Sequence, residues 1–237
     1  MRYVKEDYDN QGLIFPIPVL TPVEQEICLA HFALLESDLP ELPRYVGGMH
    51  FSHRWGHELS VHPRVLDAVE SVLGPDLLVE SAMILCKYAH DPGFAPWHQD
   101  GEYTQWYRAP ACSAWIALTD SFPENGCMRV IPGSHQAGRQ PHSSEPVPDC
   151  MFARPTSLQV EVDESIAVDV TLRAGEMSIH HGSLIHGSKP NQTNTKRAGF
   201  IVRFVTPEYT YNRAPFPLIR ARGTADCSHL VLAEGRW

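Results

Sequence analysis

The amino-acid sequence has no long apolar run and no cluster of basic residues. No apolar segment approaches the roughly 18 residues that a membrane-spanning helix requires, and the first seven residues lack the apolar core of a signal peptide. With a net charge of −9 and no run of Lys or Arg, the chain has no surface typical of nucleic-acid or anionic-membrane binding. These absences predict a cytoplasmic protein whose partner is a small molecule rather than a nucleic acid or a membrane.

Closely spaced cysteine pairs are also absent. The six cysteines include no C-x-x-C pair, which argues against a zinc finger and against a disulfide-stabilised secreted domain, so we expect free, mostly buried thiols. They are Cys28, Cys86, Cys112, Cys127, Cys150 and Cys227. The chain has no internal repeat and no low-complexity segment. Its 237 residues, 43% hydrophobic and 20% charged, suit one globular domain with a sizeable core.

The N-terminal part, about residues 1–75, is predicted to be helical. Thr21 is an expected N-cap, followed by Pro22 at the first helical position and Glu24 at the third, the pattern of a capping box. Apolar residues then recur at helical spacing, at Val23, Ile27, Ala30 and Leu34. A second helix is predicted from Pro63 to Gly74, with a buried side formed by Val65, Leu66, Val69 and Val72.

Short strands separated by turns are predicted over about residues 76–206, where Pro-Gly, Asn-Gly and Ala-Gly pairs mark the turns. Such a series is typical of a sandwich or barrel, here with flanking helices. Residues 132–165 are rich in Pro, Ser, His and Glu and are expected to form a long surface insertion. The predicted strands are Leu77–Tyr88, Cys112–Thr119, Met128–Ile131, Ala167–Leu172, Glu176–His181 and Gly199–Thr206.

We therefore expect a single domain over residues 1–237, in which a tail, residues 207–237, follows the helical part and the barrel. The tail contains Tyr209, Tyr211, Arg213 and Phe216. It either covers the mouth of the barrel or packs against a partner subunit, so a monomer and a homodimer are both compatible with the sequence.

A His-x-Asp pair with a distant third histidine is the strongest chemical signal. His98 and Asp100 are separated by one residue, and His186 lies about ninety residues downstream. Chance readily produces His-x-Asp in a chain with 13 histidines, so the pair needs its context: it follows a predicted strand and a Gly-Pro-rich turn. Alternate residues of an extended segment point the same way. Two histidines and one carboxylate form the facial triad that holds Fe(II) and leaves positions open for chemistry.

Three downstream histidines compete for the place of the third ligand. His180 and His181 are neighbours on a predicted strand, so at most one of them faces the barrel interior. His186 precedes Gly187 and Ser188, small residues that leave room for a metal and a co-substrate, and this favours His186. Arg197 follows eleven residues later and is a candidate anchor for the carboxylate of a co-substrate such as 2-oxoglutarate.

The stretch from Met83 to Phe204 resembles the phytanoyl-CoA dioxygenase family of Fe(II)/2-oxoglutarate oxygenases. The order and spacing of several segments match as well as their composition. The segments are Trp97–Gly101 (WHQDG), Ala114–Leu118 (AWIAL), Pro123–His135 (PENGCMRVIPGSH) and His181 through Arg197.

The resemblance implies a double-stranded β-helix, which is a jelly-roll, cupin-like barrel with flanking helices. It also implies His98, Asp100 and His186 as iron ligands and Arg197 as the partner of the distal carboxylate of 2-oxoglutarate. The family includes halogenases in which the carboxylate ligand is replaced by Ala or Gly; the presence of Asp100 therefore favours hydroxylation over halogenation.

Further positions match the co-substrate pocket of the family. Ser188 corresponds to a residue that hydrogen-bonds the co-substrate, and Trp115 and Met83 to residues that line its pocket, although both could equally be core residues. Lys87 points either into the co-substrate region or out to solvent. His135 has a family counterpart, and we interpret it as a turn residue rather than a ligand.

The predicted function is that of an Fe(II)- and 2-oxoglutarate-dependent dioxygenase that uses O₂ and releases succinate and CO₂. The chain is short and ends in Glu-Gly-Arg-Trp, without a peroxisomal targeting tripeptide, which speaks against the fatty acyl-CoA substrate of the founding enzyme. We expect hydroxylation of a small polar metabolite, such as an intermediate of natural-product biosynthesis. Desaturation, ring formation and dealkylation use the same iron centre, and the spacing of the ligands does not separate them.

Candidate substrate contacts lie in two segments. One follows the His-x-Asp pair, and the other lies before the predicted barrel. Tyr103 and Arg108 stand in an aromatic segment with Trp106 and Tyr107, and His50 lies in the loop-like segment 47–55, which could act as a lid. His180 is a further candidate. Aromatic packing and solvated histidines are an equally good interpretation of these residues.

Two other classes of protein share the expected fold. A cupin-type metalloenzyme that does not use 2-oxoglutarate would present more histidine ligands and give Arg197 no role. A non-catalytic jelly-roll binding protein would be free to lose a member of the triad. The intact set of His98, Asp100, His186 and Arg197 favours the oxygenase.

Overall fold

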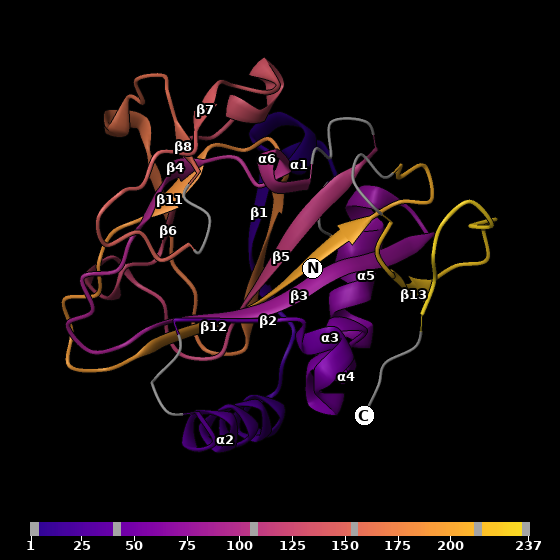
Figure 1. The fold of residues 1–237 in the computed structure, drawn as a ribbon, viewed down its shortest axis with the longest axis horizontal. Coiled ribbons are helices and arrows are strands. Elements are labelled where there is room, and N and C mark those ends of the chain that lie inside the picture. Colours follow the sequence, from indigo (N-terminus) through magenta and orange to yellow (C-terminus); the bar gives the residue numbers. More distant parts are fainter. Residues whose placement is uncertain (1–4, 40–43, 105–108, 153–155, 211–214, 234–237) are drawn as a thin grey trace.

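Two antiparallel β-sheets face each other in the computed structural model, which describes residues 5–39, 44–104, 109–152, 156–210 and 215–233 (Figure 1). The larger sheet has the strand order β1-β10-β5-β12-β3-β13, with β2 also paired to β3, and the smaller has the order β4-β11-β6-β9. A short ladder joins β7 to β8. The predicted jelly-roll architecture with flanking helices is confirmed.

Strands of the larger sheet come from both ends of the chain as well as from its middle. They are β1 (Leu13–Pro18), β2 (Tyr45–Gly47), β3 (Leu77–Lys87), β5 (Ala111–Ala117), β10 (Glu176–His181), β12 (Arg197–Val205) and β13 (Ile219–Arg222). The other strands are β4 (Ala95–His98), β6 (Met128–Val130), β7 (His142–Ser143), β8 (Ser157–Leu158), β9 (Val168–Val170) and β11 (His186–Ser188). The predicted strand Glu176–His181 is confirmed at both ends. The strands that were not predicted are β1, β2, β4, β7, β8, β11 and β13.

Helices pack on the outer face of the larger sheet (Figure 1). They are α1 (Lys5–Gln11), α2 (Pro22–Ser37), α3 (Met49–Ser52), α4 (Arg54–Ser60) and α5 (Pro63–Leu73); the short helix α6 (Gly101–Thr104) follows β4 and lies near α1 in Figure 1. Both predicted helices are present. Thr21 and Glu24 form the predicted capping box, and Gly74, with φ of +95°, ends α5, a conformation that glycine adopts without strain.

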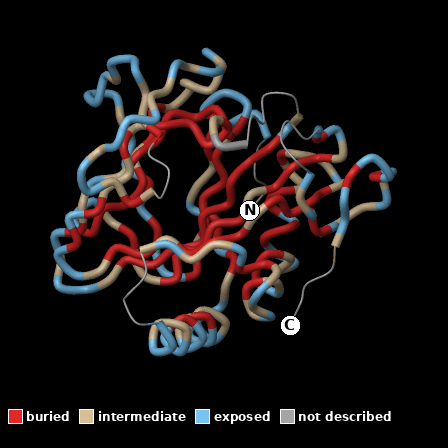
Figure 2. The backbone as a smooth tube through the Cα atoms, in the orientation of Figure 1, coloured by how far each residue is buried: buried red, intermediate tan, exposed pale blue. Residues whose placement is uncertain are grey.

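The apolar stripe of α2 faces solvent rather than the core. Val23, Ile27 and Leu34 are 64%, 52% and 63% exposed, whereas Cys28 and Phe32 of the same helix are buried against the larger sheet. Figure 2 shows α2 with a buried inner side and an exposed outer side. Helical spacing thus predicted the helix, but the buried side is the one that carries the single large aromatic side chain.

Two apolar layers lie on either side of the larger sheet. On β12, Phe200, Val202 and Phe204 belong to the core beneath the helices, while Ile201 belongs to the core between the two sheets. Side chains of a strand alternate between its faces, so one strand contributes to both layers. The inner layer borders the candidate site.

Residues 132–165 form two short 3-10 helices, η3 (Ser134–Ala137) and η4 (Glu164–Ile166), and the β7–β8 ladder. Most of this segment is exposed or half-buried, as predicted, but Met151 and Thr156 are buried. An isolated bridge between Phe94 and Cys150 brings the segment against the strand β4 that carries His98. The insertion is therefore part of the wall around the site rather than a surface appendage.

The tail packs against the edge of the larger sheet. Its strand β13 pairs with β3, and Tyr209, Leu218 and Cys227 form a small core with Val205 of β12. Tyr211 and Arg213 lie outside the described residues. Within the part of the chain that the structure describes, no helix is long and apolar enough to cross a membrane.

Candidate active site

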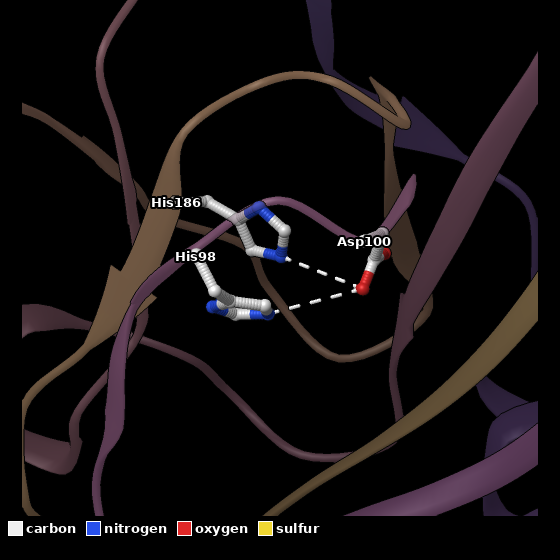
Figure 3. Close-up of side chains that lie close together, drawn as sticks. All are labelled: His98, Asp100 and His186. Carbon is white, nitrogen blue, oxygen red and sulfur yellow. Dashed lines mark ion pairs between the residues drawn. The ribbon is translucent and has the colours of Figure 1, made fainter. Parts of the chain in front are cut away.

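The three residues of the predicted triad come together where β4 and β11 pair. The register of these antiparallel strands places His186 directly opposite His98, and Asp100 follows β4 and turns toward both imidazoles (Figure 3). All three residues are buried. Among the described residues they are the one group of ligand-type side chains able to hold a metal ion, with ligand atoms within 4.8 Å of one another.

Backbone carbonyls orient the two imidazoles. Nδ1 of His98 lies 2.8 Å from the carbonyl oxygen of Pro96, and Nδ1 of His186 lies 2.9 Å from that of Leu184. Because a carbonyl oxygen only accepts, each Nδ1 carries the proton and each Nε2 keeps its lone pair. The two Nε2 atoms are 3.8 Å and 3.9 Å from Oδ1 of Asp100, so small side-chain rotations bring all three atoms to one ion.

Burial favours neutral histidines, while nearby cations keep the carboxylate ionised. Burial lowers the pKa of His98 to about 4 and holds the pKa of His186 well below its usual range. Burial alone would raise the pKa of Asp100, but Arg203, His180 and His186 hold it well below its usual range. Two neutral imidazoles and one carboxylate suit Fe(II) and leave positive charge on the ion. The residues present therefore fit such a metal.

A cavity of about 280 Å³ opens beside this group. Met83 and Trp115 line it and also belong to the apolar core between the two sheets, so both expected positions apply to them. Ser188 and Arg197 line it as well. The remaining wall consists mainly of apolar side chains. The lining residues are Tyr45, Met83, Leu85, Ala95, His98, Asp100, Trp115, Met128, Met151, Phe152, His180, His186, Gly187, Ser188, Arg197, Ile201 and Arg203.

Arg197 is a buried cation that has no acidic partner among the described residues. It is 3% exposed, its Nη2 donates to the carbonyl of Gly126 at 2.8 Å, and its guanidinium carbon lies 5.3 Å from the ring centroid of Trp115. Its Nε is buried without a hydrogen-bond partner in the part of the chain that the structure describes. Burial lowers the pKa of Arg197 to about 10, so the side chain stays charged at neutral pH. A buried charge in this state favours an incoming anion.

Lys87 points inward, which decides between the two orientations expected for it. The residue is fully buried, and its Nζ donates to Oγ of Ser188 at 2.6 Å and to the carbonyls of Gly126 and Lys189. Burial, and then Arg197, lower the pKa of Lys87 to about 6. Lys87 does not line the cavity; it reaches the site through Ser188.

Other predicted contacts lie elsewhere or outside the description. His50 does not line the cavity: it is buried in α3, where its Nδ1 accepts a hydrogen bond from the backbone N–H of Ala82 at 3.1 Å. Its candidacy as a substrate contact has no support in this geometry, because the ring belongs to the helical layer. Arg108 lies outside the described residues, and Tyr103 is placed in α6 by its backbone alone.

The two neighbouring histidines of β10 point to opposite faces, as predicted. His180 lines the cavity, with Nε2 3.2 Å from Oδ2 of Asp100. His181 lies against Tyr8 and His135 on the other side of the strand. His135 is part of η3 and contacts the carbonyl of Asp9, as expected of a turn residue.

Two further polar residues, Arg203 and Ser113, contact Asp100 and were not predicted. Arg203 donates from Nη2 to Oδ1 at 2.7 Å, and Ser113 donates to Oδ2 at 2.6 Å. One signal was available for Arg203: it stands six residues after Arg197 on the same strand, an even spacing that places both on one face. Ser113 has no comparable signal because its role depends on which strands are neighbours.

The residue between the first two triad members ties the insertion to the site. Gln99 is fully buried; its side-chain amide donates to the carbonyls of Gly138 and Ser183, and its Oε1 accepts from the backbone of Gln140. The insertion also supplies Met151 and Phe152 to the cavity, and Phe152 meets the ring of His98 edge-on.

Comparison with solved structures finds the same fold in non-haem oxygenases. The non-heme monooxygenase ThoJ aligns with a TM-score of 0.83 and 34% identity over 98% of this chain and 87% of its own in the apo form. A nickel complex of ThoJ aligns with a TM-score of 0.78, at 32% identity over 97% of this chain and 87% of its own. The epimerase SnoN, in complex with Fe3+, alpha ketoglutarate and nogalamycin RO, gives a TM-score of 0.73 at 23% identity over 89% of this chain and 85% of its own.

Comparison with protein families and curated proteins agrees with the fold. Phytanoyl-CoA dioxygenase domain-containing protein 1 of Rattus norvegicus is 29% identical over 201 residues, which are 77% of this chain and 60% of the rat protein. The chain spans about half to three fifths of the length of such curated relatives. The family model for phytanoyl-CoA dioxygenase (PhyH) matches residues 46–199, a stretch that contains the triad and Arg197. The chain belongs to the phytanoyl-CoA dioxygenase family.

Proposed function

We infer that this protein is an Fe(II)- and 2-oxoglutarate-dependent oxygenase that oxidises a small metabolite. One observation carries the proposal: a cluster of two neutral imidazoles and a carboxylate shares a cavity with Arg197, a buried cation without an acidic partner in the described chain. A metal with open positions and an anion-binding arginine are the two requirements for a chelating dicarboxylate co-substrate. The ligands named for the SnoN complex, Fe3+ and alpha ketoglutarate, support this choice.

Each residue of the site has a task in this proposal. His98, Asp100 and His186 hold the metal, and the guanidinium of Arg197 binds the far carboxylate of 2-oxoglutarate through paired N–H donors. Ser188 lines the cavity and would hydrogen-bond the co-substrate, while Lys87 Nζ, 2.6 Å from its Oγ, holds the hydroxyl in place.

The bound metal and co-substrate supply the oxidising power. With O₂, Fe(II) and 2-oxoglutarate provide an oxidant able to attack an unactivated C–H bond, with release of succinate and CO₂. The protein orients the substrate carbon and excludes water, and the apolar wall around the triad, including Met128, Phe152 and Ile201, fits the second task.

The apolar wall also narrows the substrate class. From the sequence we expected a polar metabolite, and the cavity lining favours one whose reacting carbon belongs to an apolar portion, with polar groups directed to the mouth near Tyr45, which is 47% exposed. Hydroxylation is the proposed outcome because Asp100 occupies the third ligand position. The complex of SnoN with nogalamycin RO supports a natural-product intermediate as the substrate.

Anaerobic spectroscopy tests this function. Fe(II) and 2-oxoglutarate are added to metal-free protein without O₂, and the weak visible charge-transfer band of the metal-bound 2-oxo acid is recorded. The band is expected in wild type, to weaken in Arg197→Ala and to vanish in His186→Ala. As a matched control, Arg173→Ala removes an exposed arginine paired with Asp120 and keeps the band. Metal binding without the band in wild type would contradict the use of 2-oxoglutarate.

A further inference from the structure

Three inward-facing polar side chains form a row across the larger sheet. Strands β10, β5 and β12 are consecutive in that sheet (Figure 1), and their register pairs Ser113 with His180 on one side and with Arg203 on the other. Directly opposite residues have Cβ atoms about 5 Å apart. His180, Ser113 and Arg203, here called the cross-strand row, therefore lie side by side, and the two outer members line the cavity.

Every member of the cross-strand row contacts the carboxylate of Asp100. Ser113 Oγ donates to Oδ2 at 2.6 Å, and His180 Nε2 lies 3.2 Å from the same oxygen. Arg203 Nη2 donates to Oδ1 at 2.7 Å. Since a carboxylate only accepts, His180 carries its proton on Nε2. The two oxygens thus have different surroundings: Oδ2 is held by two donors, and Oδ1 faces the imidazoles as well as Arg203.

We propose that the cross-strand row positions Asp100, so that Oδ1 is presented to the metal before the metal binds. The proposal rests on the function proposed above only in taking His98, Asp100 and His186 as a metal site. Asp100 leaves β4 in the smaller sheet, whereas the row belongs to the larger sheet, so the contacts fix the carboxylate from the opposite wall of the cavity. A ligand held this way loses little rotamer freedom on binding, and second-layer partners of this kind commonly raise metal affinity.

The proposal is tested by titrating metal-free protein with Ni(II) in a calorimeter. No co-substrate is present, so the test does not depend on turnover. Ser113→Ala removes one donor to Oδ2 without changing charge and is expected to weaken Ni(II) binding about tenfold. Ser113→Thr keeps the hydroxyl and restores the affinity. Ser178→Ala is the matched control. Ser178 is fully buried two residues before His180 on the same face of β10, and its Oγ has no hydrogen-bond partner among the residues described, so this variant is expected to bind Ni(II) as wild type does.

His180 provides a second, independent variant. His180→Gln retains an N–H donor that can reach Oδ2 and is expected to bind Ni(II) more tightly than His180→Ala. A loss in His180→Ala as deep as that in His98→Ala would make His180 a direct ligand and overturn the positioning role. Thermal unfolding of each metal-free variant identifies those that have lost the fold, which are then replaced by the conservative variant at the same position.

A double-mutant cycle with Asp100 gives the decisive comparison. If Ser113 acts through Asp100, Ser113→Ala has no further effect on Ni(II) affinity once Asp100→Ala is present. Equal losses in both backgrounds would overturn the proposal, as would wild-type affinity in folded Ser113→Ala and His180→Ala. Failure of wild type to bind Ni(II) would instead contradict the metal site on which the proposed function depends.

Discussion

Two arginines on the same face of β12 have opposite electrostatic surroundings. Arg197 and Arg203 both line the cavity, six residues apart on one strand. Arg203 forms an ion pair with Asp100 at 2.7 Å. Arg197 has only a carbonyl and an aromatic face as partners in the described residues, and its Nε has no hydrogen-bond partner.

The difference distinguishes an arginine whose charge is balanced by the protein from one whose charge, we propose, is balanced by a ligand. A buried charge is tolerated when the fold supplies its counter-charge, and the Arg203–Asp100 pair meets that condition. Arg197 does not meet it among the described residues, and we therefore propose that its counter-charge comes from a bound anion. In the proposed account the same residue type therefore has a positioning role near the triad and a binding role at the other end of the strand.

Asp100→Ala is expected to have the largest effect, because it removes a proposed metal ligand and also the carboxylate that forms the 2.7 Å ion pair with Arg203. Succinate release from 2-oxoglutarate, measured with Fe(II) and O₂, is expected to fall to background. Asp100→Glu keeps the carboxylate and shows whether charge alone suffices. Wild-type rates of succinate release in Asp100→Ala would contradict the assignment of this ligand.

Removing the binding arginine has the next largest expected effect. Arg197→Ala is expected to raise the 2-oxoglutarate concentration needed for half-maximal succinate release about a hundredfold, because a buried charge pair with the co-substrate is lost. Arg197→Lys keeps a charge but not the planar fork and should fall between the two. An unchanged requirement in Arg197→Ala would mean that the carboxylate binds elsewhere.

Arg203 is expected to matter more than Arg197 for the stability of the fold, whereas Arg197 matters more for binding 2-oxoglutarate. Arg203→Met leaves the buried carboxylate of Asp100 without a cation, and the free energy of unfolding of metal-free protein should fall by roughly 2 kcal/mol, with Ser113 and His180 limiting the loss. Arg197→Met removes a buried charge that has no acidic partner and should leave stability equal or higher. Urea denaturation measures both, and equal losses would show that the two sites do not differ.

An ion pair on the surface is expected to give the smallest loss of stability. Arg64 pairs with Glu24, and their side chains are 45% and 38% exposed, so Arg64→Met should lower the free energy of unfolding by less than about 1 kcal/mol.

Hydrogen bonds from Thr21 lower the pKa of Glu24 to about 2. A carboxyl group whose pKa is lower in the folded state stabilises the fold at pH values above its pKa in the unfolded chain. This stabilisation is lost as the pH falls toward and through the pKa of the folded state.

The stability difference between wild type and Glu24→Gln should therefore narrow as the pH falls from about 5 to about 3. Urea denaturation at a series of pH values measures the difference. A gap that stays constant over this range would show that Glu24 gains nothing from its capping box.

Local patterns in the sequence were enough to predict the triad and much of the fold. The spacing of His98 and Asp100 needs only the geometry of an extended segment, and the capping box at Thr21 needs only four residues, so both were predicted. The short strand β11 was not predicted, because three residues give no periodicity and its formation depends on its neighbours β4 and β6.

Long-range register explains what the sequence did not reveal. The cross-strand row depends on which strands are adjacent and by how many residues they are offset, which no local pattern encodes. Burial of His50 similarly depends on a hydrogen bond to Ala82 in a distant strand. The outward apolar stripe of α2 shows the same limit: period predicts a helix, and tertiary packing selects the buried face.

The different roles of the two arginines are tested most directly by comparing two 2-oxo acids on nickel-loaded protein. Pyruvate offers the same chelating group as 2-oxoglutarate but lacks the far carboxylate. Calorimetry should show that wild type and Arg203→Lys bind 2-oxoglutarate more tightly than pyruvate, and that Arg197→Met binds the two alike. A preference for 2-oxoglutarate that survives in Arg197→Met would contradict the account.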